Sequence, residues 1–209
     1  MRPRTAHAAK TTTEIGHLEK AAVPEVAGSV IERIHALVIE ADVPAVRLVG
    51  IDGPAGSGKS TLARALSQAF GWPVIELDDF FSWVSFDSWW PRFEAQVVAP
   101  LLQGRSIRYQ VRDWVGAEFG EGLAGWKHLD WRPVIIIDGV GSTRSAISRD
   151  LACRVWVDAS AEERLERGVA RDGESHRGLW ERYMIRESRF FMLDGTPGRA
   201  DVRVDSGTR

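Results

Sequence analysis

The chain has no asparagine, a single cysteine and only four lysines among its 209 residues, and its charged residues nearly balance at a net charge of −2. The single cysteine, Cys153, excludes a disulfide within the chain and is typical of a reducing compartment. Its apolar neighbours predict a buried strand position rather than a nucleophile. Because no apolar run approaches the roughly 18 residues that a membrane-spanning helix needs, we expect a cytoplasmic protein with no membrane partner.

The balanced charge and the missing asparagine also argue against two classes of function. Proteins whose main partner is nucleic acid usually carry a basic surface, which this composition does not support. We therefore expect neither nucleic-acid binding nor phosphorylation of nucleic-acid ends. A GTP-dependent switch needs an N/T-K-x-D motif for guanine, and the sequence contains neither version of it.

A glycine-rich segment, residues 53–60 (GPAGSGKS), matches the phosphate-binding loop pattern G-x-x-x-x-G-K-[ST]. Residues 46–51 before it predict a buried strand and residues 61–70 after it predict a helix, which is the context that this motif needs. Glycines let several backbone N–H groups point at one anion, and the helix N-terminus adds a partial positive charge. The residues expected to bind the nucleotide are Gly53, Ala55, Gly56, Ser57, Gly58, Lys59, Ser60 and Thr61.

Lys59 is isolated in an arginine-rich chain, since its nearest lysines are Lys20 and Lys127. The compact charge of a phosphate-loop lysine cannot be supplied by the planar fork of an arginine. We expect Lys59 to reach the β- and γ-phosphates and the Ser60 hydroxyl to ligate Mg²⁺. The sequence therefore predicts binding of a nucleoside triphosphate, ATP, with Mg²⁺.

Apolar segments alternate with helical ones along the chain. The expected strands cover residues 46–51, 73–78, 132–138, 154–158 and 200–205, and the expected helices cover 24–40, 59–70, 90–102, 145–151 and 161–191. This alternation predicts an α/β protein, a P-loop NTPase three-layer α/β/α sandwich with a mostly parallel five-stranded sheet. A short hairpin is expected near residues 107–114. Residues 1–23 are expected to be a disordered extension, and residues 24–209 a single domain.

Two of these strands end in carboxylates, at the edge where open parallel sheets bind ligands. Asp138 follows four apolar residues, a pattern typical of a Mg²⁺ ligand, although a turn aspartate would look similar. Asp78 and Asp79 point to opposite sides of an extended chain, so only one is expected to face the site. There it would accept the proton of a substrate hydroxyl. A turn or helix-capping pair is the alternative.

Aromatic residues are dense after the second strand. They include Phe80, Phe81, Trp83, Phe86, Trp89, Trp90 and Phe93. Aromatic faces beside a phosphate site suit a flat acceptor such as a nucleobase, and core packing is an equally good interpretation.

Arg164, Arg167 and Arg171 recur at i, i+3 and i+7 and so form one stripe on a helix. Opposite a triphosphate, such arginines neutralise charge on the transferred phosphoryl group, although a solvated helix face would look similar. The break near Gly173 predicts a hinged lid over about residues 164–180.

These residues resemble the uridine kinase-like branch of the P-loop kinases, which is itself similar to pantothenate kinase and phosphoribulokinase. The resemblance covers roughly residues 46–205. The family carries G-x-x-x-S-G-K-[ST], D-S-F-Y and E-G segments, matched here by residues 53–60, by 78–81 (DDFF) and by Asp138 with the glycine after it. Its lid pattern R-x-x-R-x-x-x-R-D is matched in full by residues 164–172. The resemblance places Asp78 where the family has its catalytic base.

The acceptor half of the family pattern matches less well. The family's Tyr-Asp-[FW] segment is Arg112-Asp113-Trp114 here, its following histidine is missing, and the stretch around Asp87 is compressed. The resemblance implies catalytic roles for Asp78, Lys59, Arg167 and Arg171, and a metal site at Ser60 and Asp138. It places Asp78, Phe81, Asp87, Arg112, Asp113 and Trp114 near the acceptor.

The sequence thus predicts an ATP-dependent phosphotransferase that moves the γ-phosphoryl group to a hydroxyl of a small molecule, with a nucleoside as the first candidate. Another hydroxylated metabolite or an antibiotic is the alternative acceptor. A nucleotide-binding regulator without transferase activity is a further alternative, which Asp78 and the arginine lid disfavour. The sequence leaves open whether the chain forms a homodimer.

Overall fold

The computed structural model describes residues 26–43, 45–83, 86, 88–116 and 121–207. The extension expected over residues 1–23 lies outside this range. Within the described residues, no helix is both long enough and apolar enough to cross a membrane.

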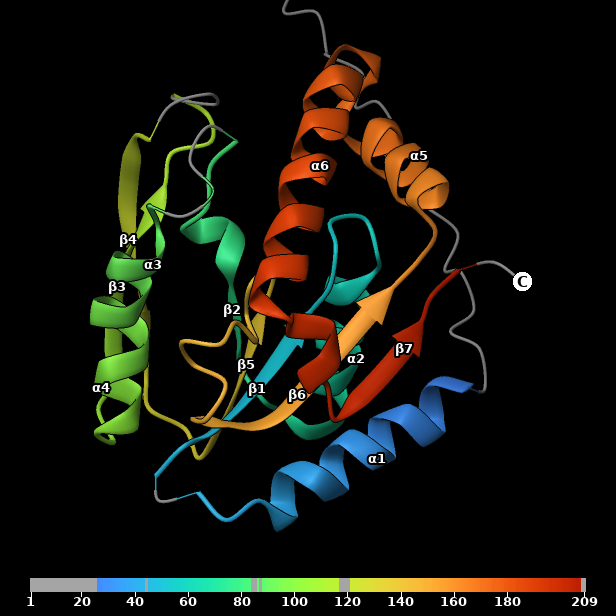
Figure 1. Ribbon diagram of the computed structural model, residues 1–209. Coiled ribbons are helices and arrows are strands. Elements are labelled where there is room, and N and C mark those ends of the chain that lie inside the picture. The colour runs from blue at the N-terminus through green and yellow to red at the C-terminus, as the bar shows by residue number, and fades with distance from the viewer. Residues whose placement is uncertain (1–25, 44, 84–85, 87, 117–120, 208–209) are drawn as a thin grey trace, which may run out of the picture.

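Five parallel strands form the central sheet, in the order β2-β5-β1-β6-β7 (Figure 1). Their bounds are Arg47–Asp52 for β1, Val74–Glu76 for β2, Val134–Asp138 for β5, Leu151–Asp158 for β6 and Val202–Asp205 for β7. All five residues of β5 are buried, as a run of apolar residues predicts for a parallel strand that is covered on both faces. The predicted five-stranded sheet is therefore confirmed.

Helices cover both faces of the sheet (Figure 1). On one face, α1 (Val26–Glu40) and α2 (Lys59–Phe70) bury an apolar cluster that includes Ile34 and Leu66 against β1, β5 and β6. On the other face, α6 (Arg177–Asp194) places Phe191 edge-on against Trp156 of β6, with ring centroids 4.7 Å apart. The predicted three-layer α/β/α sandwich is confirmed.

A helical segment and a hairpin complete the second face on the β2 side. The helix runs through α3 (Trp90–Phe93), a π-helical turn η2 (Glu94–Val98) and α4 (Ala99–Leu102). Pro100 has no amide hydrogen to donate, and the π-helical turn lets the Ala99 amide bond to Glu94 instead of the usual partner. The hairpin pairs β3 (Ile107–Arg112) with β4 (Leu123–Leu129). The sequence predicted a short hairpin within residues 107–114, whereas this range holds only the first strand and the second lies at Leu123–Leu129.

The helix expected over residues 145–151 is wrong. Residues 145–150 form turns, and β6 begins at Leu151. The amide and the hydroxyl of Ser145 both donate to the carboxylate of Asp194, the hydroxyl at 2.6 Å. The amides of Ile147, Ser148 and Asp150 bond to carbonyl oxygens three residues earlier, as in successive turns, and not four residues earlier as in an α-helix.

The arginine-bearing segment forms α5 (Ala161–Asp172), a short η3 (Glu174–His176) and the start of α6. A capping box between Ser160 and Glu163 begins α5. The helix ends at Gly173, whose φ of 96° is the break that the sequence predicted. The α5–α6 pair packs closely, since a Cβ on Gly168 would lie 2.4 Å from the Trp180 ring.

Candidate active site

The phosphate-binding loop connects β1 to α2 and needs its glycines. Gly53, Gly56 and Gly58 have φ values of 139°, 79° and 86°, a region that favours glycine. A Cβ on Gly53 would lie 1.9 Å from the Val157 carbonyl oxygen, and one on Gly56 would lie 2.6 Å from the Arg164 carbonyl oxygen. The loop is therefore wedged between β6 and α5, which fixes the direction of its backbone.

The loop presents donors that suit an anion. Among the described residues, no hydrogen bond uses the amide groups of Gly58, Lys59 or Ser60, which are at the N-terminus of α2. The Lys59 ammonium is only 7 % exposed and donates to the Pro54 carbonyl oxygen at 2.9 Å. Free amides and a buried cation around one curled loop fit the phosphates of a nucleotide.

Ser60 and Asp138 form a pair that suits Mg²⁺. The Asp138 Oδ1 atom is buried without a hydrogen-bond partner in the structure. Burial, helped by the nearby Asp78 and Glu76 charges, raises the pKa of Asp138 to about 6, although the Ser60 hydroxyl and Lys59 oppose this rise. Mg²⁺ usually binds one or two protein groups together with phosphates and water.

A cavity of about 310 Å³ unites these groups with residues of the β2 end and the lid. Its lining includes Lys59, Ser60, Asp78, Asp138 and Arg171. Ala55, Gly56, Gly58 and Thr61 line it as well, so nine of the predicted nucleotide, metal and catalytic residues lie around this cavity.

The adjacent carboxylates of Asp78 and Asp79 face different neighbours. Asp78 faces the cavity, where the surrounding protein raises the pKa of its carboxyl group and the charges of Lys59 and Arg171 oppose the rise. Asp79 instead turns to the hairpin, where it accepts bonds from Lys127 at 2.8 Å and from the Tyr109 hydroxyl at 3.1 Å. Only Asp78 is close enough to the phosphate loop to act there.

The predicted acceptor residues are only partly gathered at the cavity. Phe81 and Trp114 line it, and the Trp114 indole N–H donates to the Asp78 carbonyl oxygen at 2.9 Å. Arg112 does not line it and lies over the Trp114 ring, 4.4 Å from the ring centroid. The Asp113 carboxylate accepts from the amides of the turn that follows it. Asp87 lies outside the described residues.

The three lid arginines have three different positions. Arg171 lines the cavity and pairs with Asp172, with Nε 2.7 Å from Oδ1. Arg167 donates to the Gly56 carbonyl oxygen at 3.2 Å and to Ser206, behind the loop rather than inside the cavity. Arg164 pairs with Glu187, with Nη1 2.6 Å from Oε1. A single stripe on α5 therefore serves both the cavity and the back of the loop.

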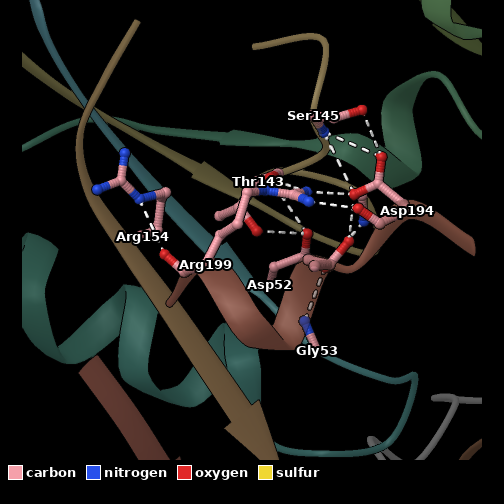
Figure 2. Close-up of polar contacts among 9 residues, drawn as sticks. Asp52, Gly53, Thr143, Ser145, Arg154, Asp194 and Arg199 are labelled. Carbon is pink, nitrogen blue, oxygen red and sulfur yellow. Dashed lines mark hydrogen bonds and ion pairs between the residues drawn. The ribbon is translucent and has the colours of Figure 1, made fainter. Parts of the chain in front are cut away.

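Asp52, which the sequence analysis did not select, anchors the base of the loop. Its buried carboxylate accepts hydrogen bonds from the amides of Gly53, Gly141 and Thr143 at 2.7 to 2.8 Å, and from the Thr143 hydroxyl at 3.0 Å (Figure 2). These bonds tie the loop to the segment that follows Asp138. An acidic residue at the end of an apolar strand was the available signal for this role.

The same network continues to the end of α6 (Figure 2). Arg199 donates to the Thr143 carbonyl oxygen at 3.2 Å and pairs with Asp194, which also holds Ser145. The Arg199 carbonyl oxygen in turn accepts from Arg154 of β6 at 3.1 Å. Charged hydrogen bonds thus join three segments: the start of the phosphate loop, the segment that follows Asp138 and the segment that follows α6.

Comparisons with known proteins agree with this arrangement. Residues 49–188 match the family described as AAA domain. A possible uridine kinase from Bacillus stearothermophilus has a similar structure, with a TM-score of 0.61 and 20 % identity, and the match covers 85 % of this chain and 98 % of that one. A protein provisionally assigned as a fructose transport system kinase from Silicibacter sp. TM1040 is also similar, with a TM-score of 0.64 and 18 % identity, and the match covers the same shares of the two chains. No curated protein sequence matches significantly.

The identities to the two solved structures are low, so these two likenesses establish the fold. The family match covers more than half of the chain and includes the phosphate loop, Asp78, Asp138 and the arginine lid. The chain belongs to the AAA domain family, and its fold is that of the uridine kinase-like P-loop kinases.

Proposed function

We propose that this protein transfers the γ-phosphoryl group of ATP to a hydroxyl group of a small molecule. P-loop kinase folds generally bind a nucleotide with Mg²⁺. The observation that carries the proposal is that one cavity contains Lys59, the Ser60–Asp138 pair, Asp78 and Arg171. A site that only binds a nucleotide needs Lys59, Ser60 and Asp138. It does not need a further carboxylate such as Asp78 beside them.

The phosphates would be held by the loop amides and by Lys59. The Lys59 ammonium would exchange its bond to the Pro54 carbonyl oxygen for the phosphate oxygens. Ser60 and the free Oδ1 of Asp138 would hold Mg²⁺, which neutralises charge on the β- and γ-phosphates when it is bound. Positioning and charge neutralisation of this kind account for most of the catalysis of phosphoryl transfer.

Asp78 would orient the acceptor and take up its hydroxyl proton. A carboxylate with a raised pKa is a better proton acceptor than an ordinary one. The protein around the cavity raises the pKa of Asp78 by displacing water, although the residue is exposed at the cavity surface. A base in this position contributes roughly 10²–10⁴ in rate. The indole N–H of Trp114, bound to the Asp78 carbonyl oxygen, holds this part of the chain in place.

The lid would complete the site from α5. Arg171 reaches the cavity and would stabilise charge on the transferred group. Arg167 is held behind the loop at Gly56, so its catalytic role is proposed to depend on lid movement. The break at Gly173 supplies a hinge for such a movement.

The acceptor remains open among nucleosides, other hydroxylated metabolites and antibiotics. A nucleoside follows from the family resemblance, and Trp114 and Phe81 at the cavity are compatible with a flat ring. A nucleotide-binding regulator without transfer activity is the second candidate function. A regulator of this kind would not need the carboxylate of Asp78 in the cavity.

The test is an ATP-dependent phosphorylation screen read by mass spectrometry, with nucleosides, sugars, vitamins and hydroxylated antibiotics as acceptors. We expect a product heavier by one phosphoryl group. The Asp78→Asn variant should bind ATP but form no product, and Asp42→Asn, at an exposed position after α1, should match the wild type. ATP binding without any product would favour the regulator.

A further inference from the structure

A second cavity opens beside the first and is unusually acidic. It measures about 490 Å³ and shares Glu76, Asp78, Trp83, Trp114 and Arg171 with the nucleotide cavity. Its remaining lining residues are Asp79, Asp172 and His176. Because the two cavities share Asp78, the second is the space from which an acceptor hydroxyl would reach that carboxylate.

Two of the four carboxylates in this cavity are already compensated. Asp79 is paired with Lys127, and Asp172 is paired with Arg171. Glu76 and Asp78 make no ion pair among the described residues. Lys59 and Arg171 are the cations whose charges oppose the raised pKa of Asp78. The phosphates of a bound nucleotide would engage both of them, which would also draw Arg171 away from Asp172. The acceptor space would then carry an uncompensated negative charge.

The other walls are the indole rings of Trp83 and Trp114 together with Arg171 and His176. Trp114 is held by its bond to the Asp78 carbonyl oxygen at 2.9 Å. Trp83 meets Trp180 and Tyr183 edge-on, with ring centroids 5.8 Å and 5.4 Å apart. Aromatic faces attract cations through their electron density, and indole is the strongest side chain in this respect. Carboxylates and preset indoles together favour a cationic ligand.

We infer that the acceptor carries a protonated amine in addition to the hydroxyl group that is phosphorylated. This inference rests on the proposed function and narrows its substrate class. The amine would lie against Glu76 and Trp83, because the Arg112 guanidinium already lies over the Trp114 ring, while the hydroxyl group reaches Asp78. An acceptor that carries phosphate or carboxylate would meet like charge, and a neutral one such as uridine would offer no counter-charge to the exposed Glu76.

The experiment uses acceptor pairs that differ in charge and keep their hydroxyl groups. The pairs are choline with 3,3-dimethylbutan-1-ol, glucosamine with N-acetylglucosamine, and kanamycin with its N-acetylated form. Uridine and glucuronate serve as the neutral nucleoside and the anion. We expect product from the cationic member of at least one pair, with a kcat/KM at least about tenfold above that of its neutral partner. The preference should weaken at high salt.

A matched variant locates the preference in this cavity. Glu76→Gln should bring the ratio of cationic to neutral kcat/KM toward one. Because Glu76 also lines the nucleotide cavity, the ratio is the readout, since an effect on ATP binding acts equally on both acceptors of a pair. Glu40→Gln, at the exposed end of α1, should leave the ratio as in the wild type.

The outcomes separate this inference from the proposed function. Preferential phosphorylation of uridine, glucuronate or any neutral partner overturns the cationic acceptor and leaves the kinase function standing. An unchanged preference in Glu76→Gln overturns the assignment of the amine to this cavity. Absence of product from every compound overturns the inference together with the proposed function.

Discussion

Glu187 of α6 accepts a hydrogen bond from the Ala55 amide of the phosphate loop at 2.8 Å, although 132 residues separate the two in sequence. The Glu187 side chain is 1 % exposed, and its other oxygen accepts from Arg164 at 2.6 Å. Arg164 also approaches the Ala55 carbonyl oxygen, at 3.4 Å. The two lid helices therefore hold the outer turn of the phosphate loop through one buried ion pair.

Removing only one member of the Arg164–Glu187 ion pair should destabilise the protein. Glu187→Ala leaves the Ala55 amide without its acceptor and the buried Arg164 guanidinium without its counter-charge. We expect a loss of about 3 kcal/mol in the free energy of unfolding, measured by urea denaturation. Glu187→Leu combined with Arg164→Met should recover much of the loss, because removing both charges relieves the uncompensated burial. A loss below about 1 kcal/mol in the single variant would contradict the proposed anchoring.

Lys59 should be irreplaceable in turnover. Lys59→Ala removes the cation beside the phosphates and should abolish ATP turnover. Lys59→Arg keeps the charge but should still lower turnover by on the order of 10²-fold, since the larger planar fork does not fit the place of a compact ammonium. Product formation by mass spectrometry measures both, and circular dichroism checks that each variant is folded. Normal turnover in Lys59→Ala would disprove the phosphate-loop assignment.

Asp138 should lower the stability of the protein when no metal is bound. Burial raises the pKa of Asp138 to about 6, so the ionised form disfavours folding at any pH above that value. Without Mg²⁺ and nucleotide, Asp138→Asn should therefore be more stable than the wild type by about 1–3 kcal/mol at pH 7–8. The difference should shrink as the pH falls below about 6 and disappear below the ordinary pKa of 3.8, where the carboxyl group becomes protonated in both the folded and unfolded states.

Binding of Mg²⁺ and ATP should favour the wild type over Asp138→Asn in thermal stability. Mg²⁺ with ATP should raise the melting temperature of the wild type and should raise that of Asp138→Asn much less. Calorimetry at several pH values measures both effects. An Asn variant that is less stable than the wild type at pH 8, or that gains equally from Mg²⁺ and ATP, would argue against a metal site here.

The charge of Asp194 should stabilise the folded protein, so its contribution to stability should change with pH in the direction opposite to that of Asp138. Burial alone would raise the pKa of Asp194, but hydrogen bonds from Ser145 and Thr196 and the Arg199 guanidinium lower it to about 2. Since the folded-state pKa is depressed, the stabilisation is present above about pH 4 and is lost as the pH falls toward 2. Asp194→Asn should cost about 1–2 kcal/mol at pH 7, and the two unfolding curves should converge near pH 2. A constant difference across this range would mean that the charge of Asp194 is not responsible.

The sequence predicted the parts of the site that are local in the chain. The phosphate loop, the end of β5 at Asp138 and the break at Gly173 each follow from neighbouring residues, and the structure places them as expected. Asp78 and Asp79 do face different neighbours, but the reason given for this was wrong. The expected strand over residues 73–78 ends at Glu76, and the two aspartates lie in the 3-10 turn Leu77–Asp79 that follows it.

The remaining parts depend on contacts between distant segments. Nothing near Glu187 in the sequence indicates that it meets the Ala55 amide, since this contact depends on how α6 crosses the sheet. The turns at residues 145–150 depend in the same way on Asp194. Arg112 was expected at the acceptor because of its position in a motif, whereas its side chain stacks on Trp114 instead. Partners distant in sequence decide the first two cases, whereas Arg112 stacks on a ring only two residues away.

Gly168 provides a last test, which addresses how closely the lid helices pack. A Cβ at this position would lie 2.4 Å from the buried Trp180 ring, so Gly168→Ala must push α5 and α6 apart. We expect this overpacking to cost about 1–3 kcal/mol in unfolding free energy, which outweighs the roughly 1 kcal/mol that alanine gains over glycine within a helix. Gly28→Ala in α1 is the matched control, because nothing lies within 4 Å of the Cβ it would add. There the helix propensity acts alone, and urea denaturation should show stabilisation by about 0.5–1 kcal/mol. If both substitutions stabilise the protein, α5 and α6 are not in the close contact that places Arg171 at the cavity.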